Sequence, residues 1–273
     1  MLKFDYLKLY LEKRMMRIFL LGIMSGFPWV LIGSALSLWL KENDLSRSTI
    51  GWASLIFGVY AINFLWAPLI DRLQIPFFSK KFGHRKSWIF VMQIIIFCSL
   101  LTWSFLDPTK NLWLIIFAGL IIAISSATQD ITIDALRIEQ IGKNEGKAMA
   151  AGAAMSVVGW WTGYKIGGVI ALLSADFFQN QGIYNYWQLS FLILSLIIVV
   201  CIIFLLFIPE KSSHERVVLQ KQADKKILNK LGSTNKIAKI FAFTSGTVIN
   251  PLLSFFQKNT LKVALGILGF IFL

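Results

Sequence analysis

Six long stretches of mostly apolar residues constrain this chain more than any other feature of its sequence. A helix needs about 20 such residues to cross the roughly 30 Å hydrocarbon core of a bilayer. We therefore predict an all-α membrane protein with six spanning helices. The predicted spans lie at about Ile18–Leu40, Thr49–Ile70, Trp88–Leu106, Leu112–Ala135, Met149–Ala175 and Trp187–Ile208.

The composition excludes a soluble protein. Hydrophobic residues make up 56% of the 273 residues and charged residues only 15%, whereas a soluble domain has roughly 25% charged residues. In a soluble protein, the net charge of +13 would suggest nucleic-acid binding. In a membrane protein, an excess of positive charge first indicates which loops lie in the cytoplasm. We therefore predict the lipid bilayer as a partner and no nucleic acid.

No catalytic or metal-binding constellation is apparent in the sequence. The two cysteines, Cys98 and Cys201, lie in apolar stretches, and the two histidines, His84 and His214, lie in separate basic loops. Such spacing suggests neither a disulfide framework nor a metal cluster. We predict that the chain is not an enzyme and holds no metal.

Basic residues are distributed unequally between alternate loops. Five Lys or Arg precede the first predicted span, five follow the second, three follow the fourth and ten follow the sixth. The loops between them carry only Lys41, Arg47 and Lys110. Because cytoplasmic loops carry the excess of Lys and Arg, we predict a multi-pass protein with a cytoplasmic N-terminus.

The same pattern predicts three parts of the chain. Residues 1–208 form the six-helix transmembrane bundle, 209–260 form a basic cytoplasmic loop, and 261–273 begin a seventh span. Within the loop, Leu219, Ala223, Ile227 and Leu231 recur every four residues among lysines, which predicts an amphipathic helix on the anionic inner leaflet. A solvated linker helix is the alternative. Residues 240–256 contain several polar residues and Pro251, so we predict that they do not span.

The fourth span carries two carboxylates on one helical face. Ser126, Asp130 and Asp134 are spaced at i, i+4 and i+8. A carboxylate at membrane depth is costly unless it faces a bundle interior or a wet cavity. We predict a proton or solute site here. The alternative for Asp134 is a structural clamp with Arg137.

Lys165 is the one basic residue well inside a predicted span. It lies too deep to reach the interface easily, so it needs an anionic neighbour or water. We predict that it meets an anionic group of a solute; a structural ion pair is the alternative. On the same span, Gly159, Gly163, Gly167 and Ala171 form a small-residue stripe that predicts close packing with a second helix.

The loop after the second span contains an acid followed by a cluster of bases. Asp71 and Arg72 precede Arg85 and Lys86, and Arg137 leaves the fourth span on the same side. Such groups at helix ends can form a charge network that closes one conformation and opens in another. We predict a cytoplasmic gate formed by Asp71, Arg72, Arg85 and Arg137. Charge that only fixes the topology is the alternative.

Four motifs in order resemble the AmpG muropeptide permease family of major facilitator transporters. They are Ser25-Gly26-Phe27-Pro28, the stretch from Asn63 to Arg72, Ser126-Ala127-Thr128-Gln129-Asp130-Ile131-Thr132-Ile133-Asp134-Ala135, and Gly163-Tyr164-Lys165-Ile166-Gly167. The resemblance implies a six-helix N-terminal bundle of a major facilitator fold, followed by a truncated seventh helix. It implies a bacterial inner-membrane symporter that imports GlcNAc-anhydroMurNAc peptides for peptidoglycan recycling. The proton gradient would drive this transport without a cofactor.

On this resemblance, Gln129, Asp130, Asp134, Tyr164 and Lys165 would form the proton-coupling and substrate site. Family members usually have Arg where this chain has Lys165, and an ammonium cannot hold a carboxylate bidentately. They also have at least twelve helices, arranged as two halves around a midplane site. Three alternatives therefore stay open: a truncated non-transporting fragment, a half-transporter that pairs with a second chain or itself, and a permease for another solute.

Overall fold

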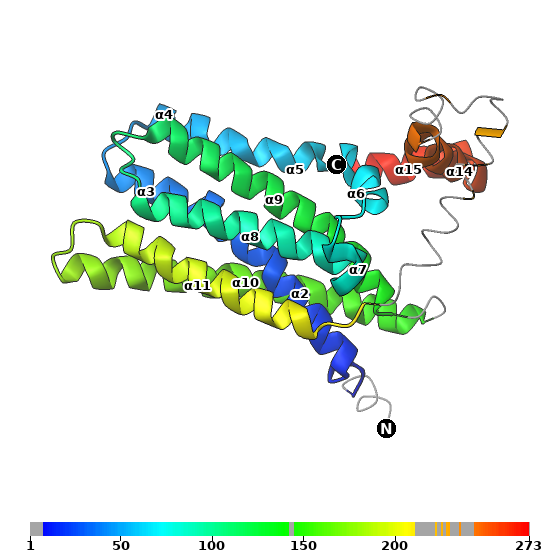
Figure 1. The fold of residues 1–273 in the computed structure, drawn as a ribbon, viewed down its shortest axis with the longest axis horizontal. Helices are drawn as coiled ribbons and strands as arrows, with labels where there is room; N and C mark the ends of the chain where they lie inside the picture. The colour runs from blue at the N-terminus through cyan, green and yellow to red at the C-terminus, as the bar shows by residue number, and fades with distance from the viewer. Residues whose placement is uncertain are drawn as a thin grey trace. The chain divides into compact units, whose positions relative to one another are not determined.

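The computed structural model describes residues 8–141, 145–210 and 243–272, together with Gln222, Lys225, Leu228, Asn229 and Asn235. Within these residues every regular element is a helix (Figure 1), which confirms the all-α prediction. The chain divides into two compact units. Unit 1 comprises the residues up to Ala67 and Gln74–Lys211, and unit 2 comprises Pro68–Leu73 and Ser212–Leu273. The predicted boundaries at 208 and 260 stay predictions, and most of the predicted amphipathic helix lies outside the described residues.

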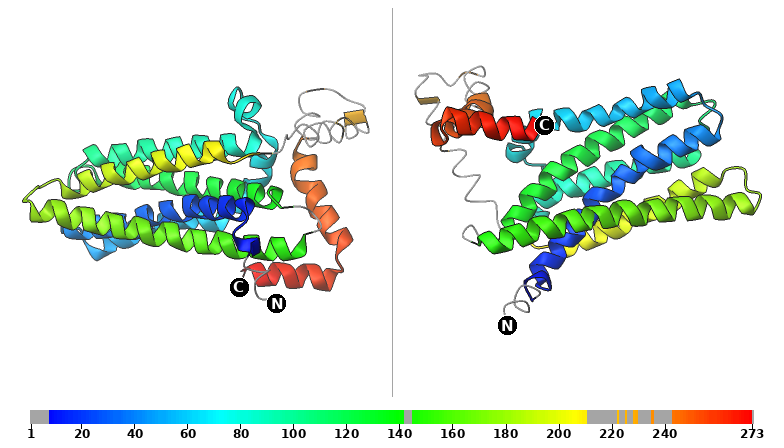
Figure 2. Two further views of the ribbon diagram at one scale, coloured as in Figure 1. Left: turned by 90° about the horizontal axis from the view of Figure 1, so that it is seen from below. Right: turned by 180° about the vertical axis from the view of Figure 1, so that it is seen from behind.

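Unit 1 is built from long helices that lie side by side, as Figure 2 shows from two further directions. The first predicted span forms α2 (Lys13–Val30), a π-helical turn η1 (Leu31–Ala35) and α3 (Leu36–Glu42). The other long helices are α8 (His84–Phe105), α9 (Leu112–Glu139), α10 (Gly146–Asn180) and α11 (Tyr186–Phe207).

The second predicted span is helical but not one regular helix. It consists of α4 (Arg47–Ala53), η2 (Ser54–Phe57), α5 (Gly58–Ile62), η3 (Asn63–Leu65) and α6 (Ala67–Arg72). The two η segments are tighter 3₁₀ turns. Gly58 and Pro68 explain part of the interruption, because glycine weakens a helix and proline lacks the backbone donor. A hydropathy pattern does not show such interruptions, because the residues in them are as apolar as their neighbours.

Five of the described helical stretches are long and apolar enough to cross a membrane. They are Lys13–Glu42, Arg47–Leu65, His84–Phe105, Leu112–Glu139 and Tyr186–Phe207. At 35 residues, or about 52 Å at 1.5 Å per residue, α10 has the length to span. Its glycines and Lys165 make it less apolar than those five stretches. Helical segments thus cover each of the six stretches that the sequence predicts to span, the second of them in several pieces.

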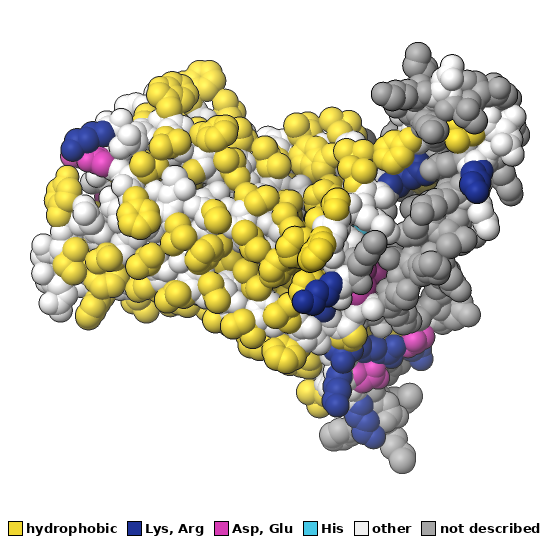
Figure 3. All heavy atoms as spheres, in the orientation of Figure 1, with side chains coloured by type: hydrophobic (Ala, Val, Ile, Leu, Met, Phe, Trp, Pro, Cys, Tyr) yellow, Lys and Arg dark blue, Asp and Glu magenta, His cyan; other side chains and the backbone are white. Residues whose placement is uncertain are grey.

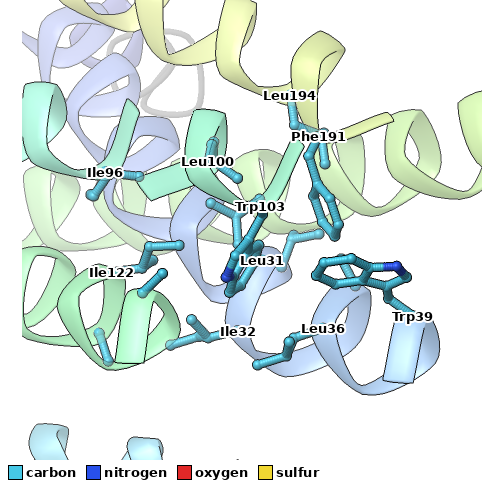
Figure 4. Packing of buried hydrophobic residues seen from close by; sticks show 14 of the residues in the cluster. Leu31, Ile32, Leu36, Trp39, Ile96, Leu100, Trp103, Ile122, Phe191 and Leu194 are labelled. Atoms are coloured by element: carbon cyan, nitrogen blue, oxygen red, sulfur yellow. The ribbon is translucent and has the colours of Figure 1, made fainter. Parts of the chain in front are cut away.

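An aromatic cluster fills the core of unit 1 near the ends of α3, α8 and α11 (Figure 4). Trp39 packs against Phe191 with ring centroids 4.9 Å apart, and Trp103 packs against Phe191 at 5.1 Å. The buried Trp103 also donates its indole N–H to the Ile115 carbonyl at 3.0 Å. Tertiary packing has thus drawn Trp39 and the equally buried Trp187 inside, although tryptophans near span ends commonly lie at the membrane interface.

The outer flank of unit 1 is apolar. Figure 3 shows hydrophobic side chains along the length of the helices, with charged side chains gathered toward their ends. The exposed surface of unit 1 includes large apolar residues such as Trp113 and Phe105, each 82% exposed. Apolar surface of this extent is typical of a lipid-facing protein.

The small-residue stripe of α10 packs against α2, as the sequence predicts. A Cβ atom added at Gly159 or Gly163 would overlap the backbone carbonyls of Phe19 and Ile23. In the same way, a Cβ at Gly26 would overlap the backbone of Trp160. The two helices therefore touch through their main chains, which only glycine permits.

Unit 2 contains short helices. Residues 245–249 form the π-helical turn η4 (Ser245–Ile249), followed by α14 (Asn250–Lys258) and α15 (Leu261–Phe272). The prediction that residues 240–256 do not span stays a prediction. Helix α15 begins at Leu261, the first residue of the predicted seventh span, and its crossing of the membrane stays a prediction.

Candidate functional site

A glutamine in α9 supplies the hydrogen bond that a proline in α2 removes from its own helix. Pro28 has no backbone N–H, so the Met24 carbonyl, four residues earlier, loses its helical donor. Gln129 Nε2 donates to this Met24 carbonyl at 2.7 Å. Gln129 is fully buried, and its bond joins α2 to α9. The sequence prediction placed Gln129 in the substrate site, whereas the contact seen here positions two helices.

Asp130 follows Gln129 on α9 and forms a second hydrogen bond between α9 and α2. Ser25 Oγ donates to Asp130 Oδ1 at 2.6 Å. The carboxylate also interacts electrostatically with the hydroxyl of Tyr60 on α5. Asp130 is half-buried. Three separate helices thus surround the carboxylate that the sequence singled out.

Aromatic side chains continue from this carboxylate along α2 and α10. Trp29 lies 4.4 Å from Tyr60 and 5.7 Å from Trp160, measured between ring centroids. Trp160 stacks on Tyr164 with ring planes only 3° apart. The Tyr164 hydroxyl shares a hydrogen bond of 3.0 Å with Ser34 in the π-helical turn. Flat aromatic faces beside hydroxyl groups can bind the apolar face of a sugar ring.

Lys165 is exposed on α10 and is not paired with Asp130. Its Nζ atom lies 5.6 Å from the centroid of the Trp161 ring, a cation–π contact. Among the described residues, no carboxylate lies within ion-pair distance of Lys165 Nζ. The two predicted charges therefore occupy separate places on α9 and α10.

Asp134 differs from Asp130 in both exposure and partner. Its side chain is 63% exposed and forms an ion pair of 3.0 Å with Arg137, three residues later. This geometry matches the structural alternative considered for Asp134. A pair so exposed contributes about 0–1 kcal/mol to stability.

A glutamate after α11 caps the first turn of α8. Glu210 accepts hydrogen bonds from the backbone N–H groups of Arg85 and Lys86, each at 2.9 Å. These donors are the ones that a capping side chain normally satisfies, and Gly83, the N-cap residue, has no side chain to do so. A Cβ atom at Gly83 would also overlap Glu210. Burial raises the pKa of Glu210 above its ordinary value, and the Glu139 carboxylate adds to this effect.

Two further bonds tie the helix ends together at this place, which we call the basic end. Arg85 Nε lies 3.4 Å from Glu139 Oε1, and Lys86 Nζ donates to the Leu206 carbonyl at 3.1 Å. The sequence prediction named Arg85 but missed Glu139 and Glu210. Glu139 lies four residues after the predicted fourth span and Glu210 two residues after the sixth, but nothing in their spacing shows that they meet α8.

The other two predicted gate residues lie in unit 2. Arg72 Nη1 donates to the Phe243 carbonyl and to Thr247 Oγ1, each at 2.6 Å. Its guanidinium also lies 4.8 Å from the centroid of the Phe243 ring. Asp71, in α6, belongs to the same unit. The predicted four-residue gate is thus divided, with Arg85 and Arg137 in unit 1.

A cavity of about 430 Å³ lies between the helix ends opposite the basic end. Trp39, Glu42 and Asp107 are among its lining residues, and Trp187 Nε1 donates to Glu42 at 2.5 Å. Thr109 donates two hydrogen bonds to Asp107 and thereby lowers the pKa of that carboxyl. None of the predicted site residues lines this cavity. Among the described residues, no cluster of His, Cys, Asp and Glu could hold a metal ion.

Comparison with known proteins agrees with this arrangement of helices. The Major Facilitator Superfamily model matches residues 18–273. The chain belongs to the major facilitator superfamily. Proteins of this superfamily are membrane permeases that act on small solutes.

Its relatives within the superfamily are AmpG proteins. A protein named AmpG 4 from Rickettsia felis is 32% identical over 252 residues, which cover 92% of this chain and 54% of the relative. The anhydromuropeptide permease of Escherichia coli K12 is 33% identical over 206 residues, covering 76% of this chain and 39% of the permease. The chain thus spans about half the length, or less, of the curated relatives it matches. It is an AmpG-like member of the superfamily.

Proposed function

We propose that this chain is the N-terminal bundle of a proton-coupled symporter that imports anhydromuropeptides across a bacterial inner membrane. The observation that carries the proposal is the similarity to the Escherichia coli anhydromuropeptide permease over 76% of this chain. Imported anhydromuropeptides would then enter peptidoglycan recycling. The N-terminus would lie in the cytoplasm, because Lys and Arg gather in alternate loops.

The geometry around Asp130 supports a role in proton coupling. A carboxylate among apolar helices gains or loses a charge when a proton binds, and that change alters the cost of burying it. Because Ser25 donates to this carboxylate, protonation would weaken the bond between α2 and α9. A proton would thereby change the packing of two helices that line the site.

The aromatic residues and Lys165 support binding of a charged sugar derivative. An anhydromuropeptide offers sugar rings that can lie on the stacked pair Trp160 and Tyr164. It also carries carboxylates, for which the exposed ammonium of Lys165 is a suitable partner. The same features would accept another anionic glycoside, so the solute itself must be tested.

Uptake of a labelled anhydromuropeptide by vesicles from cells that express the chain tests the proposal. We expect import that depends on an inward proton gradient and that Asp130→Asn abolishes. Import that ignores both the gradient and Asp130→Asn would overturn coupling at this residue. No import above vesicles lacking the chain, despite correct insertion, would overturn transport by this chain alone. Import restored only by a second chain would make it a half-transporter.

A further inference from the structure

Several buried side-chain polar atoms of unit 1 have no hydrogen-bond partner among the described residues, and three of them lie around Asp130. They are Trp29 Nε1, Tyr60 Oη and Ser126 Oγ. They come from α2, α5 and α9, and Ser126 is fully buried. A buried polar atom left unsatisfied costs about 1–3 kcal/mol. Three such atoms in one place therefore indicate a partner outside the protein.

All three atoms surround the same carboxylate. Ser126 lies one helical turn before Asp130 on α9. The Tyr60 hydroxyl interacts electrostatically with Asp130 and makes a hydrogen-bond-type approach to Ser126, and Trp29 makes a similar approach to Asp130. None of these pairs meets the geometry of a direct hydrogen bond. Polar groups that are near but not bonded are commonly bridged by water.

The chemistry of the cluster selects an amphoteric partner. The indole N–H of Trp29 can only donate, an ionised Asp130 can only accept, and the two hydroxyls can do either. A bare cation would meet the indole N–H and an anion would meet the carboxylate, both unfavourably. Water offers two donors and two acceptor sites, and a buried water needs two to four polar partners.

Few other charged or titratable groups lie near Asp130 on the helices that surround it. On α9, Asp134 is the next acid, and it is exposed and paired with Arg137. Helix α2 contributes Ser25 and Trp29, which are neutral. The titratable group that α5 contributes is Tyr60. Asp130 is thus the group at this place whose charge a single proton readily changes.

We propose that Asp130, Tyr60, Ser126 and Trp29 bind one water molecule, and that Asp130 exchanges its proton through it. A hydronium ion reaching the cluster transfers a proton to the Asp130 carboxylate and leaves a water molecule and a neutral carboxyl. Tyr60 and Ser126 are positioning residues that hold this water. The proposal rests on the proposed proton-coupled function but concerns a different step.

Infrared difference spectroscopy of the whole chain in lipid nanodiscs tests the water site without any solute. Spectra at acid minus neutral pH contain the carbonyl stretch of protonated carboxyls, and Asp130→Asn identifies the band of Asp130. We expect an accompanying O–H stretch of weakly bonded water that shifts in H₂¹⁸O. Tyr60→Phe and Ser126→Ala, which each remove one hydroxyl, should abolish this water band and move the Asp130 band.

Ser125→Ala is the matched control, because Ser125 is a buried serine on the same helix that does not belong to the cluster. It should leave both bands unchanged. The proposal is overturned if no isotope-sensitive water band follows Asp130, or if the band survives in both hydroxyl variants. If the water band is present but the chain imports no solute, only the proposal of transport is overturned. If import follows the proton gradient but the water band is absent, only the proposal of the water site is overturned.

Discussion

Helix α2 packs most extensively against α10 and α9, and these two contacts are built in opposite ways. Against α10 the main chains touch, because an added Cβ at Gly26 or Gly163 would overlap backbone atoms of the other helix. Against α9 the contact is made by polar side chains, with Ser25 bonded to Asp130 at 2.6 Å and Gln129 bonded to the Met24 carbonyl at 2.7 Å. We call these the glycine seam and the polar seam.

The difference indicates which contact can respond to a signal. The glycine seam is fixed by steric fit, and the ion pair between Arg14 and Glu145 lies at the end of the two helices, away from the glycines. Changes in pH and solute therefore have little to act on among the glycines. The polar seam contains a carboxylate whose charge changes with one proton. We therefore expect substitutions in the glycine seam to decide whether the bundle assembles, and those in the polar seam to alter its activity.

The largest effect should come from a side chain placed in the glycine seam. Gly163→Val should destabilise the protein by about 3 kcal/mol or more, because the new atoms overlap the Ile23 backbone and overpacking costs 1–3 kcal/mol or more. The measurement is the free energy of unfolding in mixed micelles. Gly168→Val is the matched control, since a Cβ at Gly168 meets nothing within 4 Å. Equal losses in the two variants would refute the steric explanation.

A double-mutant cycle tests whether the bond from Gln129 compensates for the backbone N–H that Pro28 lacks. Gln129→Leu leaves the Met24 carbonyl unsatisfied, which should cost about 1–3 kcal/mol of unfolding free energy. In a Pro28→Ala background residue 28 regains its N–H, so the same change should cost less. The expected coupling energy is about 1 kcal/mol. Simple additivity would show that the bond does not substitute for the missing helical donor.

Outside both seams, the cap at the basic end should have a smaller effect. Glu210→Ala should cost about 1 kcal/mol, the usual value for a lost helix cap. The pKa of folded Glu210 is raised above the ordinary value of about 4.3, so the folded protein binds the proton more tightly than the unfolded chain. The stabilisation from that proton is complete below about pH 4.3 and is lost as the pH rises through the folded pKa.

Glu210→Gln isolates this pH dependence, because it keeps the shape and removes the titration. The stability of the wild type relative to Glu210→Gln should fall as the pH rises from about 4.3. Unfolding free energies of both proteins over a pH series give this difference. A difference that rises over the same range would contradict the raised pKa.

The smallest effect on stability should come from Lys165. Its side chain is exposed, and its one described contact is the Trp161 ring. Lys165→Met should change the unfolding free energy by no more than about 0.5 kcal/mol, yet solute uptake should fall sharply if Lys165 binds an anionic group. Lys165→Arg should keep uptake. A large loss of stability in Lys165→Met would instead indicate a structural ion pair.

Much of the fold was predictable from local pattern. The apolar stretches located the helices within a few residues, because a bilayer requires a fixed length of apolar helix. The glycine spacing on α10 predicted its close contact, although not that α2 would be the partner. The interruptions in the second span were not predicted, since 3₁₀ turns leave the hydropathy unchanged.

The candidate site was predicted only in part. Asp130 was identified because a carboxylate among apolar residues is rare and costly. Tyr60, Ser126 and Glu210 were not chosen as site residues, because hydroxyls are common in membrane helices and an acid near a helix end is ordinary. Their roles depend on which other helix lies beside them.

The sequence by itself determined that this chain is a helical membrane protein, and its motifs determined the AmpG-like family. These properties follow from length, apolar content and the order of residues along one chain. Only the tertiary structure decided that Gln129 completes the backbone of α2, that Glu210 caps α8 and that Trp39 lies in the core. Such pairings join residues far apart in sequence, and helical periodicity shows which face a residue occupies but not which helix will cover it.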